Sequence, residues 1–199
     1  MQLPDPTVVV DRLEPALATT GRLVEAVTPG QWGVPTPCPG WDVRALTNHL
    51  VGGLRIFAAQ LTGCDAGGEH EDDWLGDDPA AAHRDAAGAV LAAWRSPGAT
   101  ARTLSISLGP VPAPLGAVIE LTEVLVHGLD LAVATGRLHD TDAAQADWLL
   151  TLMIGMGFDA FRLPGVFGSV VPVPASAPAQ LRLLGFLGRE VSAAAALPA

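Results

Sequence analysis

Apolar residues recur along most of this chain at intervals of three and four, the spacing of one face of an α-helix. The first such stripe follows Asp5 and Pro6, a pair typical of a helix N-terminus, and ends at the segment TPGQWG. A second such pair, Asp78 and Pro79, opens the third predicted helix. The same spacing predicts helices from Trp41 to about Leu61, Ala80 to about Trp94, Leu115 to about Thr135 and Asp142 to about Phe161, and a short one near Pro178 to Leu187. We therefore expect an all-α protein.

Three segments interrupt the helical spacing. VPTPCPG is too rich in proline for a helix and is predicted to be an ordered connector. TGCDAGGEHEDDWLGDDP is polar and rich in glycine and aspartate, so we expect the most mobile loop there. TLSISL, at 103–108, alternates briefly and is predicted to be a short strand or an extended connector, since one isolated strand cannot make a sheet.

The length and helix pattern predict one domain that spans residues 1–199. Long helices joined by loops of unequal length favour an antiparallel four-helix bundle, with an extra short C-terminal helix and proline-rich connectors. The core of such a bundle is a common place for ligand and metal sites, because side chains of facing helices meet there.

Charge and cysteine content exclude several classes of function. The net charge is −10 and the chain has no lysine, which argues against nucleic acid or an anionic membrane as a partner. No apolar run approaches the roughly 20 residues of a membrane span. The two cysteines form no CxxC pair and no secretory signal precedes them, so we expect a cytoplasmic protein.

A histidine stands in the apolar stripe of the second predicted helix. His49 lies three and four residues from Leu46 and Ala45, where a core residue is expected. One explanation is a core histidine satisfied by a backbone or carboxylate hydrogen bond. The other is a metal ligand.

Glu123 and His127 are four residues apart in the fourth predicted helix and so project from the same side of it. With His49 they form three ligands that leave a coordination position open, as in a catalytic zinc site. Imidazole and carboxylate also accept iron, nickel or cobalt. The alternative is an ordinary solvated strip made of Glu120, Glu123, His127 and Asp130.

Other polar and aromatic residues are assigned no chemistry. Cys38 is expected to be a small buried hydrophobe because no basic group is visible near it in the sequence. Trp32 and Trp41 are expected to anchor the connector. The remaining histidines, interpreted as ordinary surface residues, are His70, His83 and His139. The sequence contains no nucleotide-binding glycine motif and no GxSxG.

Three blocks of the chain resemble one known family. They are TPCPGWDVRALTNHLVGG at 36–53, ELTEVLVHGLDLAVATG at 120–136 and VPVPASAPAQLRLLGFLGR at 171–189. With them the chain resembles the DinB-like superfamily, and within it the actinobacterial metal-binding proteins related to the N-terminal domain of mycothiol-dependent maleylpyruvate isomerase. The resemblance implies a four-helix bundle in which His49, Glu123 and His127 hold a divalent metal, usually zinc.

In related enzymes the metal binds the sulfur of a low-molecular-weight thiol, mycothiol, whose thiolate attacks an electrophile. The resemblance thus implies a metal-dependent thiol S-transferase with a small-molecule thiol and an electrophile as its substrates. Asp130 is a candidate to orient a ligand imidazole, with an ordinary surface carboxylate as the alternative. The isomerases carry a further C-terminal domain that this chain lacks, so isomerase activity is not expected.

Two other functions stay open from the sequence. One is a non-catalytic metal-binding bundle, or a homodimer formed through the aliphatic faces. The other is metal-assisted hydrolysis with Glu120 or Asp130 as general base. The sequence identifies neither the substrate nor the residues that would contact the thiol.

Overall fold

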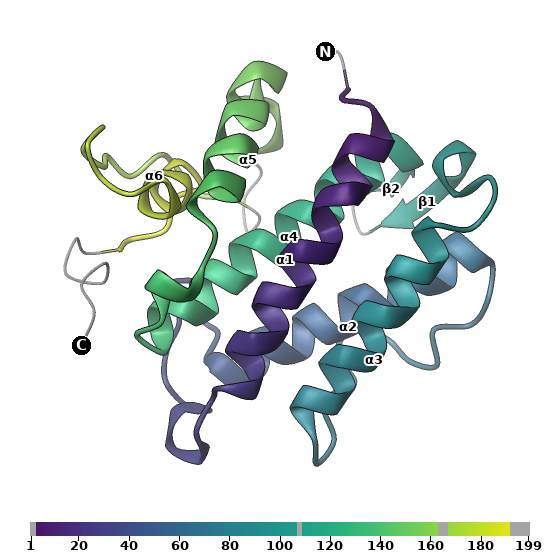
Figure 1. Cartoon of the computed structure of the whole chain (residues 1–199), viewed down its shortest axis with the longest axis horizontal. Helices are drawn as coiled ribbons and strands as arrows, with labels where there is room; N and C mark the ends of the chain where they lie inside the picture. The colour runs from purple at the N-terminus through teal and green to yellow at the C-terminus, as the bar shows by residue number, and fades with distance from the viewer. Residues whose placement is uncertain (1–2, 107–108, 163–166, 192–199) are drawn as a thin grey trace.

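Helix α4, Ala113–Ala134, runs through the middle of the computed structural model, which describes residues 3–106, 109–162 and 167–191. It packs against α1, Pro6–Glu25, and α2, Val43–Thr62 (Figure 1). Helix α3, Pro79–Trp94, packs against α1 and α2 and completes the bundle. The expected helical bundle is confirmed as the fold.

Aspartate side chains begin several of the helices. Asp5 accepts a hydrogen bond from the backbone N–H of Thr7, and Asp42 accepts one from Ala45. Asp78 does the same at the start of α3. Each side chain satisfies a donor that the first helical turn leaves unpaired. The starts of α1 and α3 were therefore predictable from their Asp-Pro pairs.

The fifth helix is shorter than expected. Helix α5 covers Ala143–Met156 instead of continuing to Phe161. Gly157 ends it with a φ of 70°, and a 3₁₀ turn, Phe158–Phe161, follows. The apolar spacing continues across this glycine, which is why the pattern alone overestimated the helix.

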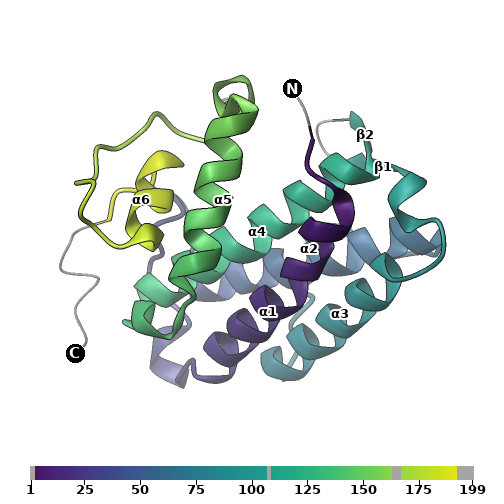
Figure 2. The same cartoon turned by 45° about the horizontal axis from the view of Figure 1, so that its top comes forward.

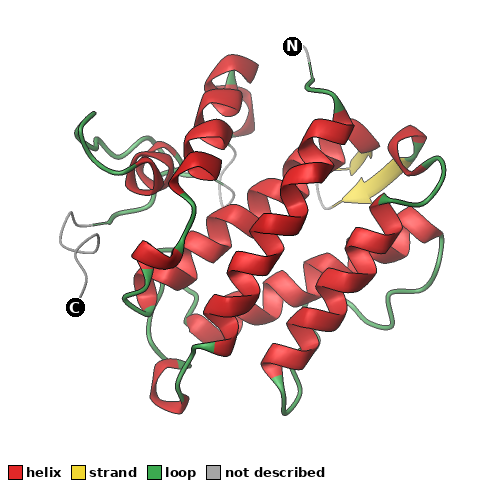
Figure 3. Cartoon of the chain, viewed as in Figure 1, coloured by secondary structure: helices red, strands yellow, loops and turns green. Residues whose placement is uncertain are grey.

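The segment 103–108, predicted to be a short strand or an extended connector, is a strand over its first four residues, and 107–108 lie outside the described residues. Strand β1, Thr103–Ile106, pairs antiparallel with β2, Gly109–Pro112, in a two-stranded sheet (Figure 3). The partner strand was not predicted because β2 contains two prolines, which strands tolerate only where no neighbour needs the missing N–H. The side chain of Gln60 bonds to the backbone of Ser105 and ties the hairpin to α2.

Helix α6, Ala179–Phe186, packs against α5. Together they lie at one end of the bundle and the hairpin lies at the other (Figure 2). Across the described ranges, none of these helices has both the length and the apolar character required to cross a membrane.

The glycine- and aspartate-rich loop is tied to α2. The amide of Asn48 donates to the carbonyl of Asp72 and accepts from the N–H of Trp74, at 2.9 and 2.8 Å. The Trp74 indole donates to the carbonyl of Glu69 at 2.9 Å. Its ring lies so close to Gly52 that a Cβ there would come within 2.6 Å of it. These contacts place the loop beside the N-terminal half of α2.

His83 is buried in the structure, and its interpretation as a surface residue was wrong. It faces α1, where a Cβ on Gly21 would lie 3.3 Å from its Nδ1 atom. Its Nε2 atom has no hydrogen-bond partner among the described residues. Burial penalises the charged ring and lowers the pKa of His83 to about 4.

We predict that His83 makes the fold acid-sensitive. The unfolded chain takes up this proton near the ordinary pKa of 6.5, but the folded chain does so only near 4, so stability falls as the pH drops through that window. Between about pH 7.5 and pH 4.5 this costs about 2 kcal/mol. Urea unfolding at both pH values is expected to show a smaller loss for His83→Leu than for wild type.

The exposed His139 provides the matched control, since His139→Leu makes the same substitution at the surface. Its acid loss is expected to equal that of wild type. Equal acid losses for wild type and His83→Leu would contradict the prediction.

Candidate metal centre

Three side chains from two helices converge beside the middle of α4. His49 extends from α2, and Glu123 and His127 extend from consecutive turns of α4. The Nε2 atom of His49 lies 3.1 Å from Glu123 Oε2, and the Nε2 atom of His127 lies 3.0 Å from the same oxygen. One ligand atom from each residue lies within 4.8 Å of the other two. The structure thus brings together the three residues that the spacing singled out.

The second ring nitrogen of His127, Nδ1, contacts a buried carboxylate. Its Nδ1 atom lies 3.2 Å from Asp130 Oδ2, one turn further along α4. The same oxygen accepts a hydrogen bond from Arg189 of the C-terminal segment at 3.4 Å. When the ring is neutral, a carboxylate that accepts the Nδ1 proton leaves the electron pair on Nε2, which is the atom that a metal would bind once the Nε2 proton is released. Asp130 therefore aims the Nε2 atom of His127 at Glu123.

The polar strip of α4 is not a solvated face. Glu120, His127 and Asp130 are only 1%, 6% and 0% exposed, and Glu123 alone is partly open. The alternative of an ordinary surface strip is therefore wrong. The mixed pattern resembled a surface helix because the sequence could not show that α1 and α2 both cover α4.

The charges of the cluster stabilise one another. Burial raises the pKa of the Glu123 carboxyl, but hydrogen bonds from His127 and His49 outweigh it and hold that pKa well below its ordinary value. Burial lowers the pKa of His127, and the carboxylates of Asp130 and Glu123 outweigh this and raise it to about 9. Glu123 is therefore ionised at neutral pH and available as an anionic ligand.

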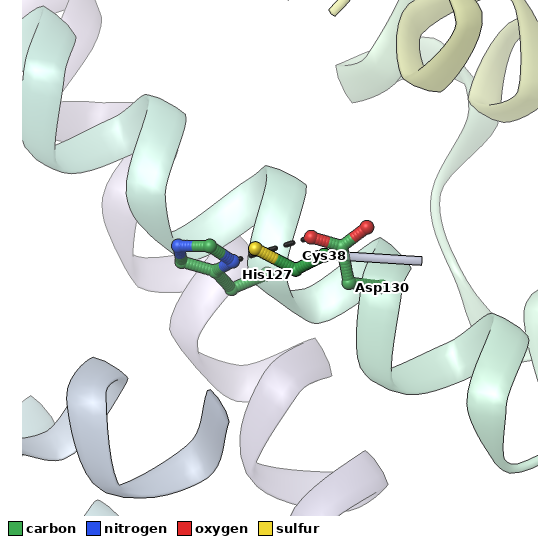
Figure 4. Close-up of side chains that lie close together, drawn as sticks. All are labelled: Cys38, His127 and Asp130. Carbon is green, nitrogen blue, oxygen red and sulfur yellow. Dashed lines mark hydrogen bonds and ion pairs between the residues drawn. The ribbon is translucent and has the colours of Figure 1, made fainter. Parts of the chain in front are cut away.

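Cys38 lies on the Nδ1 side of His127, beside Asp130 (Figure 4). Arg189 Nη2 is 3.7 Å from its sulfur, so a basic group does stand near it, contrary to expectation. That group comes from a remote part of the sequence. Burial nevertheless raises the pKa of the Cys38 thiol to about 11. The thiol therefore stays protonated at neutral pH, and the Arg189 cation disfavours a metal ion on this side of His127.

Aromatic rings enclose the cluster. The Trp41 ring lies 4.5 Å from the His49 ring and 5.6 Å from the His127 ring, centre to centre. Its position follows from the connector, where Thr36 bonds to the Trp41 carbonyl through its N–H at 3.0 Å and its hydroxyl at 2.9 Å. His70, from the tied loop, stacks on His49 at 5.7 Å. Trp41 thus does more than anchor the connector, because it also restricts both imidazoles.

A cavity of about 880 Å³ opens beside the cluster. His49 and Glu123 both line it, whereas Cys38 and Asp130 do not. Cavities that bind small molecules commonly measure about 300–1,000 Å³. Any ion held by the three residues would therefore face a space large enough for a small-molecule ligand.

Glu120 borders the same cavity one turn before Glu123. The Trp94 indole donates to its Oε2 atom, while its Oε1 atom has no partner among the described residues. Burial without a nearby cation raises the pKa of Glu120 to about 8, although the Trp94 hydrogen bond opposes this rise. At neutral pH the residue is thus a neutral acid and a poor general base.

Comparison with known proteins places this geometry in a family. The model of the mycothiol maleylpyruvate isomerase N-terminal domain matches residues 13–132. Two relatives from Mycobacterium tuberculosis, strains CDC 1551 and H37Rv, are described as uncharacterized proteins MT0763 and Rv0738. Each is 34% identical to this chain over 94% of its length and 99% of the relative.

Solved structures share the fold at low identity. The crystal structures of a mycothiol-dependent maleylpyruvate isomerase and of its histidine-to-alanine mutant each match with a TM-score of 0.53 and 16% identity. Each match covers 74% of this chain and 72% of the isomerase. The likeness extends over most of the bundle.

We predict that Glu120→Gln makes the folded protein more stable above neutral pH. The folded carboxyl holds its proton to about pH 8 and the unfolded one to about 4.5, so stability falls as the pH rises between these values. Wild type is expected to lose about 3 kcal/mol between about pH 5 and pH 8 beyond the loss of the variant. Urea unfolding at both pH values measures the difference, with the exposed Glu25→Gln as control. Parallel stability curves for wild type and Glu120→Gln would contradict the assignment.

Proposed function

Because the chain belongs to the family of the mycothiol maleylpyruvate isomerase N-terminal domain, we propose that it is a metal-dependent thiol S-transferase. In this proposal His49, Glu123 and His127 hold a divalent metal. A low-molecular-weight thiol, mycothiol or a similar one, attacks an electrophilic small molecule beside it. The observation that carries the proposal is the convergence of both Nε2 atoms on Glu123 Oε2 at the edge of the cavity.

The donor set fits a transition metal. Two imidazoles and one carboxylate are the ligands of open zinc sites, and nickel or iron accepts them as well. The charges also fit, since one carboxylate leaves a net positive charge that attracts a thiolate. The bound metal would lower the pKa of a coordinated thiol so that the nucleophile forms at neutral pH.

The protein's own groups would position the reaction. His49 and Glu123 face the cavity, so the fourth position would open toward the ligand space. Asp130 would keep His127 in the tautomer that presents Nε2. Trp41 would cover the imidazoles on one side and limit the access of water. The electrophile would occupy the cavity.

Both cysteines are free. Free cysteines suit the reducing conditions in which a small-molecule thiol also stays reduced. The proposal accordingly locates the protein in the cytoplasm. It assigns no attack to Cys38, whose thiol stays protonated at neutral pH.

We predict near-stoichiometric zinc or another transition metal in protein purified without a histidine tag. His49→Ala and His127→Ala each remove one of the three ligands and are expected to lose the metal. Elemental analysis measures this, with the exposed His139→Ala as a matched control that keeps it. Absence of metal from reconstituted wild type would refute the proposal.

A cobalt-substituted sample tests the thiol step. Adding the thiol is expected to produce a sulfur-to-cobalt absorption band in wild type, because the open position takes the sulfur. An unchanged spectrum at saturating thiol would contradict the thiol step. The protein would then be interpreted as one that binds a metal but transfers no thiol.

Asp130 is predicted to support metal binding without being a ligand. Asp130→Asn weakens the hold on the His127 ring and is expected to lower metal affinity about 10- to 100-fold. Competition with a chromogenic chelator measures the affinity, and circular dichroism checks the fold. The exposed Asp140→Asn is the control. An affinity equal to that of wild type would remove Asp130 from the site.

A further inference from the structure

Two adjacent glycines of α2 face different surroundings. A Cβ on Gly52 would collide with the Trp74 ring, so Gly52 is needed for packing. A Cβ on Gly53 would meet no atom of the described residues within 4 Å. Gly53 lies one helical turn after His49 and lines the cavity, so its missing side chain leaves space beside the candidate metal centre.

The walls of this space are mostly apolar. Residues of α2, the hairpin and α4 contribute to them, namely Leu50, Leu54, Phe57, Leu104, Val111 and Leu115. Apolar walls favour a ligand that removes its own apolar surface from water. The cavity therefore selects for hydrocarbon more than for hydrogen-bonding groups.

The charged groups around the cavity are acidic. Asp65, Glu69 and Glu71 lie on the tied loop, and Glu123 lies on α4. The residues that line the cavity include no arginine among those the structure describes, and the chain contains no lysine. A carboxylate or phosphate on the ligand would meet like charges, and the only basic side chains among the described lining residues are the imidazoles of His49 and His70, of which His49 already contacts Glu123 and stacks on His70.

We propose that the cavity between α2 and α4 binds an uncharged, largely apolar small molecule, which lies against Gly53. The absence of a side chain at Gly53 sets the space that this molecule occupies. The inference rests on the proposed function in one respect, namely that the bound molecule serves as the electrophile. Binding of the molecule itself needs neither metal nor thiol.

Two naphthalenes of equal shape test the charge preference. Naphthamide and naphthoate differ in that only naphthoate is anionic. Isothermal titration calorimetry of the full chain in the presence of a chelator is expected to give naphthamide an affinity at least about tenfold higher. The chelator prevents a metal from holding the carboxylate, so failure of the metal proposal leaves this result unaffected.

Gly53→Leu tests the position of the ligand. A leucine fills the open space and is expected to weaken naphthamide binding at least about tenfold, while metal content stays at the wild-type level. Gly53→Ala adds a single methyl group and favours the helix, so it is expected to fold and to weaken binding less. Gly88→Leu is the matched control, because Gly88 is a helical glycine of α3 with equally open surroundings that does not line the cavity.

The inference is overturned by any of three results. The first is the absence of naphthamide binding to wild type. The second is naphthoate binding as tight as that of naphthamide. The third is wild-type affinity in both Gly53 variants, with circular dichroism showing that they fold. A loss of binding in Gly88→Leu equal to that in Gly53→Leu would also overturn the assigned position.

Discussion

The burial of Asp130 is the constraint on which the rest of the site depends. A carboxylate with no exposed surface needs partners, because its lost hydration is not otherwise replaced. His127 and Arg189 both meet its Oδ2 atom. The first contact orients a ring of the candidate metal centre and the second ties the C-terminal segment to α4. Breaking such a buried pair typically costs about 3–5 kcal/mol, so the orientation of His127 is linked to the stability of the fold.

The same constraint separates the two sides of His127. On the Nδ1 side of the ring, a cluster contains the Asp130 carboxylate, the Arg189 guanidinium and the protonated thiol of Cys38. On the Nε2 side of the ring, Glu123 and His49 lie beside the cavity. Only the Nε2 side brings candidate ligand atoms together beside a space large enough for a second molecule. His127 thus contacts both the buried Asp130 carboxylate and the candidate metal centre.

The neighbouring elements shape the cavity on the Nε2 side of His127. The loop after α2 is fixed by Asn48 and Trp74, and it brings His70 and several carboxylates to the cavity. The hairpin closes the opposite part through Gln60 and Leu104. The shape and lining of the cavity therefore depend on parts that pack around the bundle helices.

Local rules in the sequence determined the helices and the ligand spacing. Asp-Pro pairs located the starts of α1 and α3, and the four-residue interval placed Glu123 and His127 on one side of α4. Only the tertiary structure decided which faces are covered, as at His83, and which remote residues meet, as with Arg189 and Asp130, 59 positions apart. Periodicity specifies the direction of a side chain relative to its own helix. It does not specify what packs there, because burial, pKa shifts and cavities arise from neighbours that are distant in sequence.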